Sequence, residues 1–198
     1  MTFVHTPGDD EARGDVAALY EEARAASGHV PNYVRAFSAR PEAYRAWQQL
    51  NAVVKARAPR RYELATLAAA RRLRSSYCAL AHGKVLAERF HTPVEVTAIA
   101  RDHRTAGLDD VDVAVMDLAE KVATDATSIT QADVDRLRAL GLSDEDVLDI
   151  VLAAAVRCFF SKTLDALGAE PDAVYNDLEP VLKDALTVGR GIATSSSG

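Results

Sequence analysis

Cysteine is scarce in this sequence, where only Cys78 and Cys158 occur among 198 residues. The N-terminal residues are polar and acidic and do not resemble an export signal. Two cysteines without an export signal argue against a disulfide framework. A chain of this length can bury a substantial core without disulfides or metal ions. We therefore expect a cytoplasmic protein whose thiols are reduced.

The sequence also lacks a strongly basic stretch and a long apolar run. Its 23 Lys and Arg residues are outnumbered by 29 Asp and Glu residues, which gives a net charge of −6. Residues 130–151 have the outline of a helix-turn-helix, but acidic residues crowd its second half and would repel phosphates. The best apolar run, residues 147–160, is interrupted by Asp149 and Arg157 and is shorter than the ~20 residues of a membrane span. We expect neither a nucleic-acid partner nor a membrane partner.

Alternating β-strand patterns are missing, whereas apolar residues recur at helical spacing almost throughout. Thr92-Pro93-Val94-Glu95 has the form of a capping box with proline at the first helical position. Thr130 with Asp133, and Ser143 with Asp146, are looser versions of the same signal. The sequence predicts an all-α fold of about eight helices.

No linker divides this helical body. We place an N-terminal helical extension at residues 1–27 and the main helical domain at residues 28–175. Residues 176–198 form a C-terminal helical piece, and its last ten residues, GRGIATSSSG, are predicted to be disordered.

Three polar residues mark a candidate site on one predicted helix. Ser75, Cys78 and His82 are separated by three and then four positions, which places them on one helix face. With Ser75 as the N-cap, Cys78 falls in the first turn, where unpaired N–H groups and the helix dipole favour a thiolate. His82, one turn further on, could exchange a proton with that sulfur or with a substrate. A helical hairpin could bring the carboxylate of Glu63 back to His82.

Each of these residues also has a structural interpretation. Cys78 could be a small buried hydrophobic residue, His82 a hydrogen-bonded core histidine and Glu63 a solvated residue near a helix start. Cys158 falls on an apolar helix face, where core packing is the default and a role as resolving thiol is the alternative. Because the remaining histidines are scattered, we expect no metal ion and no cofactor.

The spacing around this site resembles the AhpD-like, carboxymuconolactone decarboxylase superfamily. Many members carry a glutamate, a C-x-x-C pair twelve positions later, and a histidine after three further residues. This sequence has Glu63, then Ser75, Cys78 and His82 in that register, and Tyr77 before the cysteine is also typical.

Two flanking segments extend the resemblance to roughly residues 28–175. Residues 28–42 and 159–172 look like the corresponding parts of the peroxidase-related branch. The resemblance implies an AhpD-like fold, with a central helical hairpin that carries the site, and assembly into a homo-oligomer.

The resemblance implies a thiol-dependent alkylhydroperoxidase, an antioxidant enzyme with peroxiredoxin-like activity. Cys78 would be the nucleophile, His82 the acid/base and Glu63 a proton relay, with Ser75 and Tyr77 secondary. Ser75 replaces the resolving cysteine, so turnover would need an external thiol as well as a hydroperoxide substrate. Two alternatives stay open: acid/base chemistry on a small organic acid or lactone, as in carboxymuconolactone decarboxylases, and a non-catalytic helical assembly protein.

Overall fold

A computed structural model describes residues 2–194, and every regular element in that range is helical. The elements are α1 (Gly14–Ser27), α2 (Asn32–Ala36), α3 (Pro41–Ala56), α4 (Pro59–Arg72), α5 (Ser76–Arg89), α6 (Pro93–Asp102), α7 (Asp110–Asp125), η1 (Ala126–Ser128), α8 (Gln131–Ala139), α9 (Asp144–Ala166), η2 (Ala173–Asp177) and α10 (Pro180–Leu186). The all-α prediction is confirmed. The described part has ten α-helices where about eight were expected, and α2 and α10 are short helices of five and seven residues.

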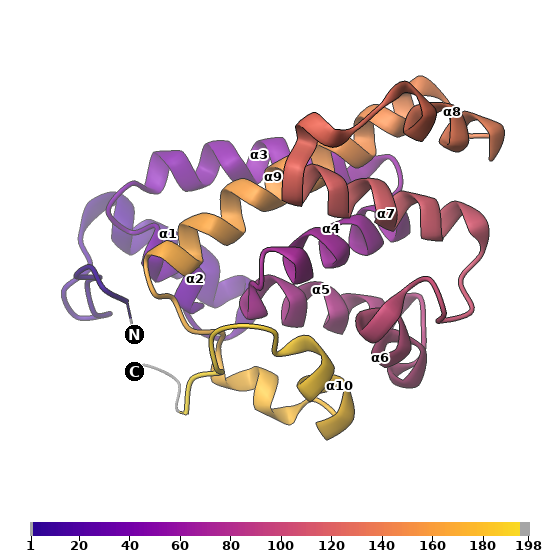
Figure 1. The fold of residues 1–198 in the computed structure, drawn as a ribbon. Helices are drawn as coiled ribbons and strands as arrows, with labels where there is room; N and C mark the ends of the chain where they lie inside the picture. The colour runs from indigo at the N-terminus through magenta and orange to yellow at the C-terminus, as the bar shows by residue number, and fades with distance from the viewer. Residues whose placement is uncertain (1, 195–198) are drawn as a thin grey trace.

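Helix α4 is the central element of the fold and packs against α5, α7 and α9 (Figure 1). Every residue from Tyr62 to Ala70 is buried. A helix buried on all sides needs partners on all sides, and the alanines of this segment let neighbouring helices approach closely. The predicted hairpin is formed by α4 and α5, which are joined by a short turn that contains Arg74 at a φ of 57°.

Several helix starts follow the predicted signals. The structure has capping boxes at Thr92, Thr130 and Ser143, each closed by the acidic residue three positions later. Each box satisfies backbone N–H groups that the first helical turn leaves unpaired.

The C-terminal segment lies across α5 and fixes it from outside the hairpin (Figure 1). Leu186 of α10 packs so closely on Gly83 that a Cβ atom there would lie 2.5 Å from the leucine side chain. Further on, the N–H of Gly189 donates to Oγ of Ser76 at 2.7 Å, and Ala193 donates to a backbone carbonyl at 2.9 Å. Residues 189–194 belong to the tail that we predicted to be disordered, and these two hydrogen bonds attach that part of it to the helical body. Residues 195–198 lie outside the described range. None of the described helices is long and apolar enough to cross a membrane.

Candidate functional site

The hairpin brings Glu63 of α4 against His82 of α5. Nδ1 of His82 lies 2.5 Å from Oε2 of Glu63. The Glu63 side chain is completely buried and that of His82 is 12% exposed. A hydrogen bond this short, shielded from water, fixes the orientation of the imidazole ring.

His82 is uncharged at neutral pH. Burial lowers its pKa to about 4, and the positive charge of Arg157 acts in the same direction, while Glu63 opposes both. A neutral ring that faces a carboxylate through Nδ1 carries its proton there. Nε2 is then left with a lone pair that can accept a proton.

Glu63 is ionised. Burial would raise its pKa, but His82 and Lys55 together lower it to about 2. Since His82 is neutral at pH 7, Lys55 is the cation that balances the carboxylate under those conditions. Nζ of Lys55 lies 2.6 Å from Oε1 of Glu63.

Cys78 lies in the first turn of α5, as predicted, and is 2% exposed. The hydrogen-bond partner of its sulfur is Arg157 of α9 rather than His82: Nη1 of Arg157 donates to Sγ at 3.3 Å. Nη2 of the same guanidinium donates to the phenol oxygen of Tyr62 at 3.1 Å. The Tyr62 ring in turn stands edge-on to the His82 ring, with centroids 5.8 Å apart.

Arg157 is a residue of this site that we did not predict from the sequence. It is 3% exposed, and in the sequence it is only a charge that interrupts an apolar helix. That interruption is the available signal, because arginine is almost never fully buried without a partner. The position of its partner on α5 follows only from the packing of α5 against α9.

Ser75 occupies the N-cap position of α5, but its hydroxyl does not accept the expected backbone N–H. The predicted capping bond is therefore wrong, although the backbone position is right. The buried hydroxyl lies instead near the carboxyl of Asp165, where burial raises the pKa of Asp165 and the serine partly offsets that rise.

Tyr77 ties the start of α5 to distant segments. Its hydroxyl donates to the carboxylate of Asp172 and accepts the N–H of Tyr33 at 3.1 Å. The other oxygen of Asp172 accepts the N–H of Asn32 at 2.8 Å. Tyr77 thus holds the first turn of α5, and with it Cys78, against α2 and the segment after α9.

Cys158 is a free thiol, as is Cys78, and it is partly exposed rather than a core residue. It directly follows Arg157 on α9, and burial raises its pKa. This placement differs from the expected packing in the core.

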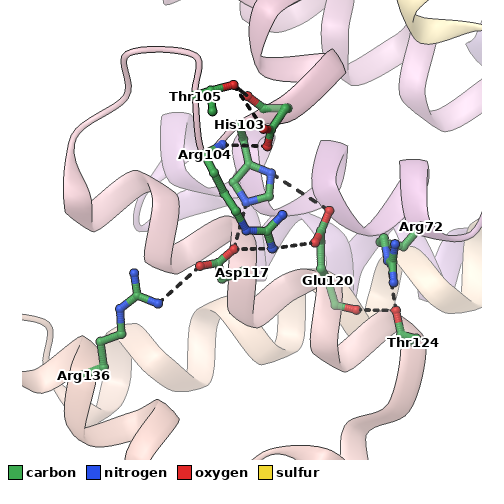
Figure 2. Close-up of polar contacts among 9 residues, drawn as sticks. Arg72, His103, Arg104, Thr105, Asp117, Glu120, Thr124 and Arg136 are labelled. Atoms are coloured by element: carbon green, nitrogen blue, oxygen red, sulfur yellow. Dashed lines mark hydrogen bonds and ion pairs between the residues drawn. The ribbon is translucent and has the colours of Figure 1, made fainter.

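A second polar cluster lies away from the hairpin site, between the α6–α7 connection and α7 (Figure 2). Buried His103 lies 3.0 Å from Asp117 through Nε2 and 4.0 Å from Glu120 through Nδ1. These three side chains are close enough to hold a metal ion. However, Nη2 of Arg104 already bridges the two carboxylates, at 2.5 Å and 3.0 Å. The guanidinium occupies the place of a cation, so the cluster serves as an ion-pair network that fastens the connection to α7.

Comparisons with known proteins place the fold. No protein-family model and no curated protein matches this chain. Among solved structures, it is similar to the AhpD core of an uncharacterized peroxidase-related protein from Ralstonia eutropha JMP134. That similarity has a TM-score of 0.79 at 22% identity and covers 88% of this chain and 94% of that one. An uncharacterized peroxidase-related protein from Silicibacter sp. TM1040 gives the same score and identity over 89% and 94%.

The debrominase Bmp8 is also similar, with a TM-score of 0.70 at 14% identity over 93% of this chain and 97% of that one. At these identities the likeness establishes the fold. The chain has the AhpD-like helical fold, and the resemblance read from the sequence is confirmed at that level.

Proposed function

We propose that this protein is a thiol-dependent oxidoreductase of the peroxidase-related type, with Cys78 as its single reacting thiol. The observation that carries the proposal is the buried guanidinium of Arg157 on the Cys78 sulfur. Next to His82 the site buries the carboxylate of Glu63, whose charge is balanced by Lys55. Within the described part of the chain, the hydrogen-bond partners of Arg157 are the sulfur and a phenol. A negative charge on the sulfur would neutralise the guanidinium of Arg157, because a buried cation without a counter-ion is costly.

The proposed chemistry assigns one role to each of these groups. Nε2 of His82 accepts the Cys78 proton, and the sulfur attacks the terminal oxygen of a hydroperoxide. The S–O bond forms as the O–O bond breaks, and the leaving alkoxide takes the proton from His82 to become an alcohol. Cys78 is oxidised to a sulfenic acid and the hydroperoxide is reduced.

Ser75 cannot resolve this sulfenic acid. An external low-molecular-weight thiol would condense with it, releasing water and forming a mixed disulfide. A second thiol would then release Cys78 and leave as the oxidised disulfide. The protein thus requires a reductant that its own side chains near Cys78 do not supply.

Acid/base chemistry on a small organic acid or lactone is the second candidate. The neutral His82 ring is fixed by Glu63 and has a free lone pair on Nε2, so it can accept a proton from a substrate without any thiol. In that case Cys78 would be dispensable for activity.

The test is a free-thiol count before and after one equivalent of an alkyl hydroperoxide, carried out in a Cys158→Ala background. We expect Cys78 to lose its thiol and to regain it with a small thiol, with little turnover under a dithiol-recycling system. A Ser75→Cys variant recreates C-x-x-C at a helix start, so it should lose two thiols together and gain turnover. An unreactive Cys78 in the folded protein would reject the thiol reading in favour of the acid/base or non-catalytic ones.

A further inference from the structure

Helix α3 contributes two side chains to the buried network, and the sequence interpretation assigned a role to neither. Oδ1 of Asn51 accepts a hydrogen bond from the hydroxyl of Tyr62. Lys55 lies one turn later, and its Nζ pairs with Glu63 at 2.6 Å. Nζ of Lys55 also lies 5.5 Å from the centre of the Tyr62 ring. Lys55 therefore contacts both the Glu63–His82 pair and the tyrosine that hydrogen-bonds to Arg157.

Lys55 is the member of this network that faces water. Its side chain is 37% exposed, whereas Glu63 is fully buried and His82 is 12% exposed. A long lysine side chain can bury its stem while its ammonium group stays at the boundary with solvent. The ammonium group of Lys55 thus pairs with Glu63 at the point where the buried Glu63–His82 pair meets the surface.

We infer that Lys55 is a positioning residue that keeps Glu63 ionised and His82 in its proton-accepting form, an inference that rests on the proposed function. Without Lys55, the buried carboxylate would face a neutral imidazole and have no cation of its own. An isolated buried carboxylate is strongly disfavoured, so the pair would hold a second proton. With that proton on the imidazole, Nε2 could no longer accept the proton of Cys78.

The charges around His82 decide the direction of this effect. Lys55 from α3 and Arg157 from α9 both favour the neutral ring, and Glu63 from α4 favours the protonated ring. Cys78, on the same helix as His82, adds a further negative charge when it ionises. Without Lys55, Arg157 is the cation among these groups that still lowers the His82 pKa, while Glu63 still raises it. The imidazole would therefore take up its proton at a higher pH.

The experiment compares Lys55→Met with Lys55→Arg. Lys84→Met is the matched control, because Lys84 is also 37% exposed and pairs with Glu88 on the surface of α5. The His82 imidazole is followed by NMR against pH, with its signal assigned by loss in His82→Gln. We expect the midpoint to rise by about 1 pH unit in Lys55→Met, as for the loss of one nearby charge. Lys55→Arg should return it to near the wild-type value, and Lys84→Met should not change it.

The same variants are then tested for the reaction of Cys78 with an alkyl hydroperoxide at pH 4, close to the wild-type His82 pKa of about 4. When the midpoint rises by about 1 pH unit, the neutral fraction of the imidazole at this pH falls from about one half to about one tenth, so the rate in Lys55→Met should fall about 5-fold and Lys55→Arg should restore it. An unchanged His82 titration in folded Lys55→Met overturns the inference, whatever the rate does. If Lys55→Met does not fold, Lys55→Gln gives the same comparison with a polar side chain. A shifted titration in a protein whose wild type ignores hydroperoxide would support the role of Lys55 and reject the proposed function instead.

Discussion

Replacing Arg157 with methionine removes the guanidinium from the Cys78 sulfur while keeping a long side chain in the same space. The two hydrogen bonds at 3.3 Å and 3.1 Å disappear, and with them the only cation that hydrogen-bonds to the sulfur in the described structure. A hydrogen bond to a charged group contributes about 1.5–3 kcal/mol. If the sulfur is negatively charged when it reacts, its reaction should slow by about 10- to 150-fold.

The stability of the variant should change much less than its reactivity. A buried charge replaced by an apolar side chain of similar size often leaves stability unaltered or improves it, because the desolvation cost goes too. The phenol of Tyr62 loses a donor but keeps its own bond to Asn51. Chemical denaturation should therefore give a midpoint close to that of the parent protein.

The assay is the rate of iodoacetamide labelling of Cys78, resolved from Cys158 by peptide mass spectrometry. Arg35→Met is the control, since Arg35 is also buried but bonds to Asp9 and a distant carbonyl. It should leave the labelling rate unchanged. An equally fast Cys78 in folded Arg157→Met would refute the view that the guanidinium activates this sulfur.

Two further predictions concern the hairpin. The pKa of His82 is lowered from 6.5 to about 4, so the free energy of unfolding should fall by up to about 3 kcal/mol as the pH falls from 6.5 to 4. Urea unfolding of His82→Gln should show a weaker pH dependence over that range. An identical pH dependence would contradict a lowered pKa for His82. Gly83→Ala places a Cβ atom 2.5 Å from the Leu186 side chain, so thermal unfolding should show a loss of about 1–3 kcal/mol in stability. Adding Leu186→Ala to the same chain should reduce that loss. If the stability losses of the two substitutions simply add, the close contact is contradicted.

The local geometry of the site could be predicted from the sequence because it depends on spacing within one hairpin. The three- and four-residue intervals place Ser75, Cys78 and His82 on α5, and a short turn between α4 and α5 returns Glu63 to His82. The capping boxes were predictable for the same reason, since each involves residues three positions apart. The capping bond of Ser75 failed because its buried surroundings, with Asp165 nearby, decide where the hydroxyl lies.

The contacts of residues 189–194 with the helical body could not be predicted from their composition. Their small and polar residues are typical of a mobile tail, but here small size permits close contact. A Cβ atom on Gly189 would lie 2.0 Å from the carbonyl oxygen of Arg74, so only glycine can follow the chain at that point. The hydrogen bonds of this segment go to Ser76 and Pro171, which belong to other parts of the chain.

Arg157 and Lys55 show why the complete set of site residues could not be predicted from the sequence. They lie 79 residues after and 23 residues before Cys78, and they reach the network from helices outside the hairpin. Their places depend on how α9 and α3 pack on α4, which is set by many apolar contacts rather than by a motif. Both residues nevertheless bring a positive charge into the network: Lys55 pairs with the Glu63 carboxylate, and Arg157 donates to the Cys78 sulfur. In the function we propose, the spacing of Glu63, Cys78 and His82 identifies the groups that would move a proton, and the two cations would determine which of those groups is charged when the reaction begins.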